Sequence, residues 1–255
     1  MGLLHKLLNS KKAERFRRTL AIKSGLYFRL KRMGPSASGD LRVAKLLQHH
    51  QIKWVIDVGA NTGQFAESLY DFGYQGRVVS FEPVSGAYQL LLERSGQYPA
   101  WSVAKRSAIG NFEGEIQIHV AADSVFSSIL PITREHVQTK PQSRTIATET
   151  VPIARLDRAV KDYLPADAKD ILLKIDTQGY EKEVLEGAPE LLSRVKGLKL
   201  EIPLHTIYDN TKLTFYDTLE MLRKQGFSPY SIGVEGVDPA TGRVNTIDGL
   251  FFRES

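Results

Sequence analysis

Two acidic residues and a glycine-rich turn lie where short apolar stretches of the sequence give way to polar residues. The turn covers residues 57–63 (DVGANTG), and Glu82 follows 19 residues after Gly63. Glycines allow backbone N–H groups to approach a ligand closely, and the N-terminus of a helix attracts an anionic group. A carboxylate at the end of the next strand is suited to accept hydrogen bonds from both hydroxyls of a ribose. These residues predict a site for a cofactor that contains a nucleoside.

Two cofactor classes would present an adenosine to such a site: the nicotinamide dinucleotides and S-adenosylmethionine. Asn61 stands where the dinucleotide-binding fingerprint requires a small residue beside the pyrophosphate. Methionine instead carries a carboxylate and an ammonium, and Asp57 is a partner for that ammonium, directly or through water. The spacing therefore favours S-adenosylmethionine, with an NAD(P)-dependent Rossmann oxidoreductase as the alternative.

A third acid ends another apolar stretch, in residues 172–181 (LLKIDTQGYE). Asp176 follows the apolar residues, and Lys174 lies two residues earlier, on the same face of the expected strand. Ligands of open α/β sheets bind at the carboxyl ends of the strands, so Asp176 is expected to face the crevice shared by Asp57 and Glu82. The alternative is a salt-bridged pair that supports the end of the strand.

Helical and extended patterns alternate from about residue 40, which is typical of a parallel α/β sheet. Strands are expected at 54–58, 78–82, 171–176, 198–202, 227–232 and 247–252, and helices at 41–50 and 211–224. A strand within 101–109 and the alternating residues 116–120 are expected to form a hairpin added to the sheet. Residues 121–150 are rich in Ser, Thr and Gln and are expected to form a long functional loop or lid.

The net charge of +5, from 34 basic and 29 acidic residues, is unevenly distributed. Residues 1–33 contain ten basic residues and one acidic residue, so they carry +9, and the rest of the chain carries −4. Leucines at helical spacing in this segment predict a basic amphipathic helix. Such a helix can lie on an anionic membrane surface or pack on its own domain, and both interpretations stay open. We expect an N-terminal extension and linker at 1–39 and a catalytic domain at 40–255.

Composition excludes several classes of function. The absence of cysteine excludes disulfides and thiolate metal sites, and no apolar run is long enough to span a bilayer as a helix. Because residues 34–255 are net acidic, the overall positive charge gives no argument for a nucleic-acid partner, and none is expected. We expect a cytoplasmic protein whose residues 1–33 can make peripheral contact with the inner membrane surface. A non-enzymatic membrane-surface adaptor is the alternative, but it would not explain acidic residues at several strand ends.

Several of these segments together resemble the FkbM family of S-adenosylmethionine-dependent methyltransferases. The segments are 55–63 (VIDVGANTG), 81–83 (FEP), 107–110 (SAIG), 127–128 (SS), 155–157 (RLD), 173–181 (LKIDTQGYE), 184–188 (VLEGA) and 248–252 (DGLFF). The first is shared by class I methyltransferases broadly, whereas LKIDTQGYE followed by VLEGA is more specific. The resemblance implies a class I methyltransferase (Rossmann-like) α/β fold with a seven-strand, mostly parallel sheet, helices on both faces and an antiparallel last strand. It also implies O-methylation of a saccharide or another hydroxyl-bearing acceptor, such as a glycolipid, polysaccharide or polyketide.

The resemblance also implies roles for individual residues. It assigns the cofactor loop to Asp57, Gly59, Asn61 and Gly63, the ribose to Glu82, the adenine edge to Ser107 and Ala108, and the position beside the transferred methyl group to Asp176. Methyl transfer to a hydroxyl requires a base that takes the hydroxyl proton. Asp176 is the first candidate for that base and Glu201 or His205 the next, with Lys174 as the neighbour of Asp176 in the catalytic set. Oxygen and nitrogen ligands from these residues could gather at strand ends, but their spacing matches no recognised metal motif, so no metal is expected.

Overall fold

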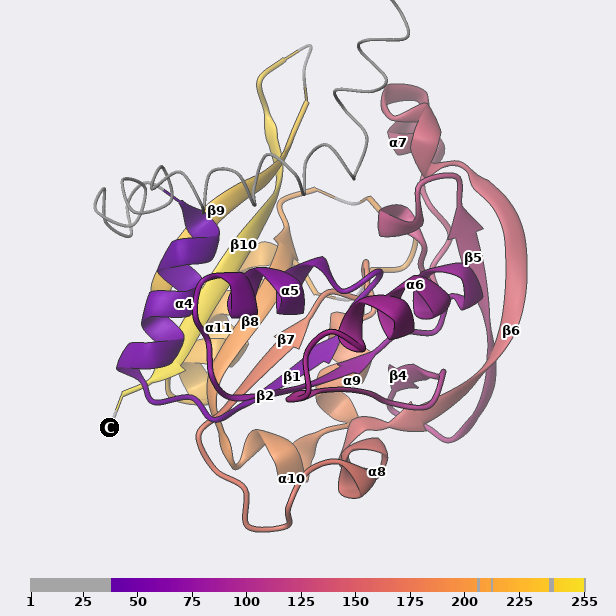
Figure 1. Cartoon of the computed structure of the whole chain (residues 1–255). Helices are drawn as coiled ribbons and strands as arrows, with labels where there is room; N and C mark the ends of the chain where they lie inside the picture. Colours follow the sequence, from indigo (N-terminus) through magenta and orange to yellow (C-terminus); the bar gives the residue numbers. More distant parts are fainter. Residues whose placement is uncertain (1–37, 206, 212, 239–240, 255) are drawn as a thin grey trace, which may run out of the picture.

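The main sheet has seven strands in the order β3-β2-β1-β7-β8-β10-β9 in this computed structural model (Figure 1). The structure describes residues 38–205, 207–211, 213–238 and 241–254. The strands of this sheet are Trp54–Val58 (β1), Arg77–Phe81 (β2), Trp101–Val103 (β3), Ile171–Ile175 (β7), Val195–Pro203 (β8), Phe227–Val237 (β9) and Val244–Arg253 (β10). Strands β3, β2, β1, β7 and β8 pair in parallel, and β10 is antiparallel to β8 and β9. The expected seven-strand, mostly parallel sheet with an antiparallel last strand is confirmed.

Helices cover both faces of this sheet. One face carries α4 (Gly39–His49), α5 (Gln64–Asp71) and α6 (Ser85–Ser95), and the other carries α8 (Leu156–Ala159), η3 (Val160–Asp162), α9 (Glu181–Glu186), α10 (Pro189–Leu192) and α11 (Phe215–Lys224). Successive strand residues point to opposite faces. In β7, Leu172 packs in the cluster of α4 and α5, whereas Leu173 packs in the cluster of α10 and α11. The central strands are therefore continuous apolar runs rather than alternating ones.

Local sequence sets where these helices begin and end. Helix α11 begins four residues later than expected because Thr214 and Asp217 form a reciprocal capping box, in which each side chain accepts the backbone N–H of the other. Helix α5 is followed by Gly73, whose φ of +86° suits glycine. At the start of α6, Val84 occupies the N-cap position without a side-chain cap, and the Ser85 hydroxyl donates to Glu149 (2.6 Å).

A second sheet stands beside the first and has the order β4-β6-β5 (Figure 1). Its strands are Ala108–Gly110 (β4), Gly114–Ala121 (β5) and Thr145–Arg155 (β6). The expected hairpin is wrong, because β3 belongs to the main sheet and β6 lies between β4 and β5. The first half of β6 is almost entirely exposed, so it lacks the apolar alternation that would have identified a strand. The expected loop is accordingly shorter and contains η1 (Ser124–Phe126), α7 (Arg134–Thr139) and η2 (Pro141–Ser143).

The order of the strands fixes the place of a ligand site. From β1 the chain proceeds to β2 and β3 on one side, and it later returns with β7 and β8 on the other side. The carboxyl ends of β1 and β7 thus form a topological switch point, where open α/β sheets bind ligands. The described residues begin at Ser38, which caps α4, so the amphipathic segment expected at 1–33 lies outside them.

Candidate active site

A cavity of about 610 Å³ lies at the switch point, a volume suited to a small-molecule site. It is lined by strand ends, by residues 124–129 of the loop before α7, and by parts of α4, β9 and β10. Among the residues expected from the sequence, the cavity is lined by Gly59, Asn61, Glu82, Ser107, Ala108, Lys174, Asp176 and Glu201. Asp57, Gly63 and His205 are not part of its lining. The structure therefore brings together eight of the eleven expected residues.

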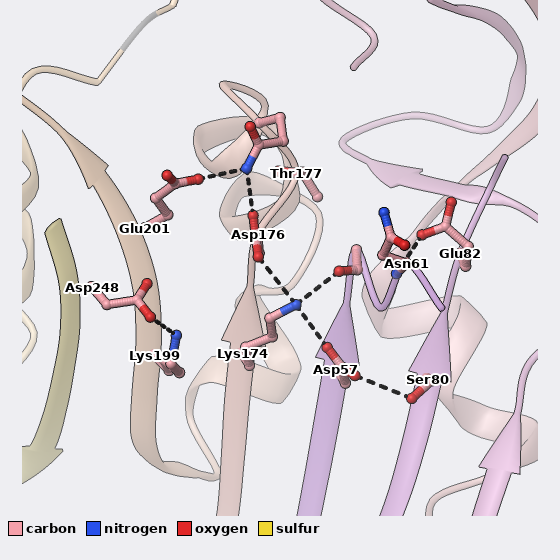
Figure 2. Close-up of polar contacts among 12 residues, drawn as sticks. Asp57, Asn61, Ser80, Glu82, Lys174, Asp176, Thr177, Lys199, Glu201 and Asp248 are labelled. Carbon is pink, nitrogen blue, oxygen red and sulfur yellow. Dashed lines mark hydrogen bonds and ion pairs between the residues drawn. The ribbon is translucent and has the colours of Figure 1, made fainter. Parts of the chain in front are cut away.

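Glu82 ends β2 at the wall of this cavity, and its side chain is only 5% exposed. Its Oε1 accepts the N–H of Val84 (2.8 Å), and its Oε2 accepts the N–H of Asn61 (2.7 Å; Figure 2). Burial raises the pKa of Glu82 to about 7, although these two N–H groups lower it. The carboxyl group is fixed in place and is close to its titration midpoint at neutral pH.

The backbone N–H groups of the glycine-rich turn donate hydrogen bonds within the protein. Gly59 and Ala60 donate their N–H groups to the carbonyl of Phe81 (3.1 and 3.0 Å), and Gly63 donates to the carbonyl of Ala60 (2.8 Å). Asn61 donates to Glu82, and Thr62 donates to the Asn61 side chain. The backbone N–H groups at 59–63 therefore all have protein acceptors in this structure, and the binding of an anionic group at this turn stays a prediction.

The glycines of the turn instead permit close packing. A Cβ at Gly59 would lie 1.9 Å from the backbone oxygen of Asp176, so only glycine lets the end of β1 approach the end of β7. A Cβ at Gly63 would lie 2.5 Å from the ring of Trp101, at a φ of +85°. The turn thus positions the strand ends that carry the acidic residues.

Asp57 does not line the cavity and is fully buried; Figure 2 shows its contacts with Lys174 and Ser80. Its Oδ1 is 2.9 Å from Lys174 Nζ, and its Oδ2 accepts a hydrogen bond from the Ser80 hydroxyl (3.2 Å). The Ser80 oxygen accepts in turn from Trp101 Nε1 (2.9 Å). Direct contact between Asp57 and a ligand ammonium, one of the two expected modes, is absent from this geometry, because both carboxylate oxygens face protein groups. Asp57 holds Lys174 instead.

Lys174 joins the ends of β1 and β7. Its Nζ donates to the carbonyl of Gly59 (2.8 Å) and also lies 3.5 Å from Asp176 Oδ2. Burial opposes the ammonium charge, but the charges of Asp57 and Asp176 raise the pKa of Lys174 above its ordinary value. Lys174 therefore stays protonated and orients Asp176; it is not a proton acceptor.

The two carboxyl groups at the ends of β7 and β8 have opposite electrostatic tendencies. Burial disfavours the charge of Asp176, but the charge of Lys174 and a hydrogen bond from Gln178 lower its pKa below the ordinary value. Burial and then the charge of Asp176 raise the pKa of Glu201 well above its ordinary value. Asp176 is thus ionised at neutral pH, and 38% of its side-chain surface is exposed toward the cavity. Glu201 is therefore the less readily ionised of the two groups.

His205 lies away from the other candidates. Its Nδ1 accepts a hydrogen bond from Arg243 Nη2 (2.7 Å), because a guanidinium can only donate. The histidine, Asp176 and Glu201 do not converge, and no group of three His, Asp or Glu side chains within the described ranges could hold a metal ion.

Sequence reasoning missed three groups that take part in the site. The Gln178 side chain bonds both Asp176 and Glu201, and Tyr208 bonds Gln178. Asn61 Nδ2 donates to the hydroxyl of Ser124 (3.1 Å), which ties the loop before α7 to the glycine-rich turn. Gln178 lies inside the segment 172–181 that had been singled out, whereas Tyr208 and Ser124 carry no local signal.

The sequence matches the family model described as Methyltransferase FkbM domain over residues 57–229. Similar solved structures include the precorrin-6y C5,15-methyltransferase of Geobacter metallireducens GS-15, with 9% identity over 83% of this chain and 88% of that one and a TM-score of 0.41. The magnesium protoporphyrin IX methyltransferase of Synechocystis PCC 6803 with bound S-adenosylmethionine has 11% identity over 99% of this chain and 96% of that one, with a TM-score of 0.45. An rRNA methylase of Streptococcus thermophilus has 12% identity over 84% of this chain and 95% of that one, with a TM-score of 0.44. No curated protein sequence matches the chain.

Proposed function

The chain belongs to the FkbM methyltransferase domain family, and from this premise we propose that it methylates a hydroxyl of a sugar, a glycolipid, a polysaccharide or a related natural product. Family membership makes it an enzyme that uses S-adenosylmethionine. The nicotinamide-dependent oxidoreductase and the non-enzymatic adaptor are thereby set aside. The identity of the acceptor is the part that we propose.

The residues of the cavity fit S-adenosylmethionine. Glu82 is held rigidly at the end of β2, and each carboxylate oxygen accepts one backbone N–H and has a second lone pair. Glu82 would hold the ribose hydroxyls, and Ser107 and Ala108 would meet the adenine edge beside the apolar Ile118. When bound, the cofactor supplies a methyl group on a positively charged sulfur.

The observation that carries the proposal is an ionised, partly exposed carboxylate at the switch point. A hydroxyl is a weak nucleophile at neutral pH, so its proton must be removed as the new O–C bond forms. Asp176 is ionised, lines the cavity and is held by Lys174 from below. We assign it the role of accepting the hydroxyl proton. Glu201, whose pKa is raised, is less readily ionised and less suited to that role.

The cavity also has room beside the cofactor site. Beyond Asp176 and Glu201, toward β9 and β10, it is lined by polar residues, namely Ser231, Glu235, Asn245, Thr246 and Asp248. Hydroxyl, amide and carboxyl side chains can exchange hydrogen bonds with several hydroxyls of one acceptor. This lining supports a polyhydroxylated acceptor.

The test is incubation of the purified protein with methyl-labelled S-adenosylmethionine and cell extracts separated into lipid, polysaccharide, RNA and small-molecule fractions. We expect label in the lipid or polysaccharide fraction, in an ether that survives mild alkali. Asp176→Asn serves as the control and should transfer at least about a hundredfold less label. Label in RNA, or in an alkali-labile ester, would contradict the proposal.

We further propose a cytoplasmic location with peripheral contact to the inner membrane surface through residues 1–33. The charge of +9 on this segment and its helical leucine spacing support the contact. None of the helices in the described ranges is long and apolar enough to cross a membrane. The full chain should sediment with vesicles containing anionic lipid at low salt and be released at high salt. Sedimentation that persists at high salt or after removal of residues 1–33 would refute this assignment.

A further inference from the structure

The backbone at Gln178 has an unusual conformation that the surrounding residues hold in place. Its φ is +58°, in the left-handed region that residues other than glycine, asparagine and aspartate rarely adopt. The Glu181 carboxylate accepts the N–H groups of Thr177 (3.0 Å) and Gly179 (3.1 Å). The Ser128 hydroxyl donates to the Gln178 carbonyl (2.7 Å). A strained residue persists only where its neighbours over-determine it, and such residues concentrate at functional sites.

The side-chain amide of Gln178 connects two carboxyl groups. Its Nε2 donates to Asp176 Oδ1 (2.7 Å) and to Glu201 Oε2 (2.6 Å). An ionised carboxylate can only accept hydrogen bonds, so the nitrogen of the amide must face Asp176. Both N–H bonds of the amide are then used, one for each carboxyl group.

Tyr208 fixes this orientation from the opposite side. Its hydroxyl lies 2.5 Å from Gln178 Oε1 and donates to it. Burial raises the pKa of Tyr208 well above its ordinary value, so the hydroxyl keeps its proton. If the amide turned over, its oxygen would face the ionised Asp176, and two groups that can only accept hydrogen bonds would meet. The amide therefore has one favourable orientation.

The two carboxyl groups that share the amide differ in their other contacts. Asp176 is next to Lys174, whereas the charges that act on Glu201 are mainly those of other acids. The charged or titratable groups around the pair are Asp57, Lys174, Glu181, Lys199, Tyr208, Glu235 and Asp248. Two carboxyl groups whose surroundings favour different protonation states can take different roles in one reaction.

We propose that Gln178 is a positioning residue for methyl transfer. Tyr208 fixes the Gln178 amide, and the NH2 group of this amide donates to both Asp176 and Glu201. These hydrogen bonds direct Asp176 at the acceptor hydroxyl. This inference rests on the proposed role of Asp176 in proton removal. In the transfer, an O–C bond forms as the methyl group leaves sulfur, and the hydroxyl proton passes to Asp176. Gln178 itself exchanges no proton.

The inference predicts distinct effects for two substitutions. Gln178→Asn keeps an amide and a side chain that tolerates the left-handed backbone, but it is one methylene too short to bridge both carboxyl groups. Tyr208→Phe leaves Gln178 intact and removes only the donor that fixes its amide. Both variants should lower turnover by on the order of tenfold or more, the value of a hydrogen bond to a charged group. The affinity for S-adenosylmethionine should stay within about threefold of the wild type.

Titration of the Asp176 carboxyl carbon, followed by NMR in protein labelled with 13C at aspartate and glutamate side-chain carboxyls, tests the inference without an acceptor. Asp176→Asn identifies the resonance. In both variants Asp176 should titrate at higher pH than in the wild type, because a hydrogen bond to its ionised form is weakened or lost. The matched controls are Tyr216→Phe, at a tyrosine that is 79% exposed, and Gln89→Asn on the surface of α6, and neither should shift the titration.

The outcomes separate this inference from the proposed function. If Asp176 titrates identically in the wild type, Gln178→Asn and Tyr208→Phe, Gln178 does not position it and the inference is overturned. A shifted titration with unchanged turnover on the acceptor fraction would also overturn it. If no extract fraction accepts label from the wild type, the proposed acceptor class fails, whereas the NMR titration still decides whether the Gln178 bridge acts on Asp176.

Discussion

The ionisation of the Glu82 carboxyl group should control the affinity for S-adenosylmethionine around neutral pH. Burial raises the pKa of Glu82 to about 7, and a carboxylate accepts hydrogen bonds from ribose hydroxyls better than a carboxylic acid does. If the ionised form is the one that binds, the competent fraction is about 0.09 at pH 6 and about 0.9 at pH 8. The affinity should therefore rise about tenfold over this interval.

The assay is calorimetric titration with S-adenosylmethionine at pH 6, 7 and 8, on the wild type and on Glu82→Gln. The variant keeps the size of the side chain but cannot ionise, so the pH dependence attributable to this residue should vanish. Any titration of the cofactor itself affects both proteins equally, and only the difference between their pH profiles is informative. Equal profiles would refute the assignment of Glu82 as the ribose-binding acid or its raised pKa.

The pH dependence of the protein's stability without the cofactor is a second test of the raised pKa of Glu82. Because the folded-state pKa of Glu82 is raised from 4.5 to about 7, the folded state binds more protons than the unfolded state in this interval. The free energy of unfolding should accordingly fall as the pH rises from about 4.5 to about 7. In Glu82→Gln this part of the decline should be missing, which urea unfolding at several pH values would measure.

Three further substitutions test the construction of the site. Lys174→Met should destabilise the fold by about 3–5 kcal/mol, because it leaves Asp57 buried without its cation. Adding Asp57→Asn should recover part of this loss, as measured by urea unfolding. If the double variant recovers no stability, the pairing of Asp57 with Lys174 is contradicted. Asp176→Asn should reduce turnover at least about a hundredfold while calorimetry finds cofactor affinity nearly unchanged, so a parallel loss of binding would count against its role in proton removal. Gly63→Ala should cost about 1–3 kcal/mol more than Gly73→Ala, since both sites have positive φ but only the first is crowded; equal thermal unfolding midpoints would contradict this reasoning.

The elements of the main sheet were predictable because their signals are local. Residues 54–58 and 171–175 are apolar on both faces and are bounded by turn residues, so each could be recognised within its own segment. The carboxyl edge then followed from the rule that parallel strands end together. Strand β6 was not predictable, because its exposed first half has no apolar alternation and its place between β4 and β5 depends on pairing over long separations.

The positions of the acidic residues in the site were predictable from the sequence, but their burial and their ease of ionisation were not. Asp57 looked like a ligand contact, yet neighbouring strands bury it completely and pair it with Lys174. Asp176 ranked before Glu201 as a candidate for the base, but the sequence carries no information on how readily either carboxyl group ionises. Their contrast comes from Lys174 beside one and a surplus of carboxylates around the other.

The sequence by itself determined the fold class, the edge of the sheet where a ligand binds and the identity of the acids at the strand ends, because strand patterns, turn glycines and acid positions lie in short consecutive segments. Only the tertiary structure decided which acid ionises more readily, which ionises less readily and which is fully buried. Those properties depend on desolvation and on distances between residues far apart in the chain, such as Gln178 and Tyr208, which are 2.5 Å apart at their oxygen atoms. No local pattern encodes such a distance.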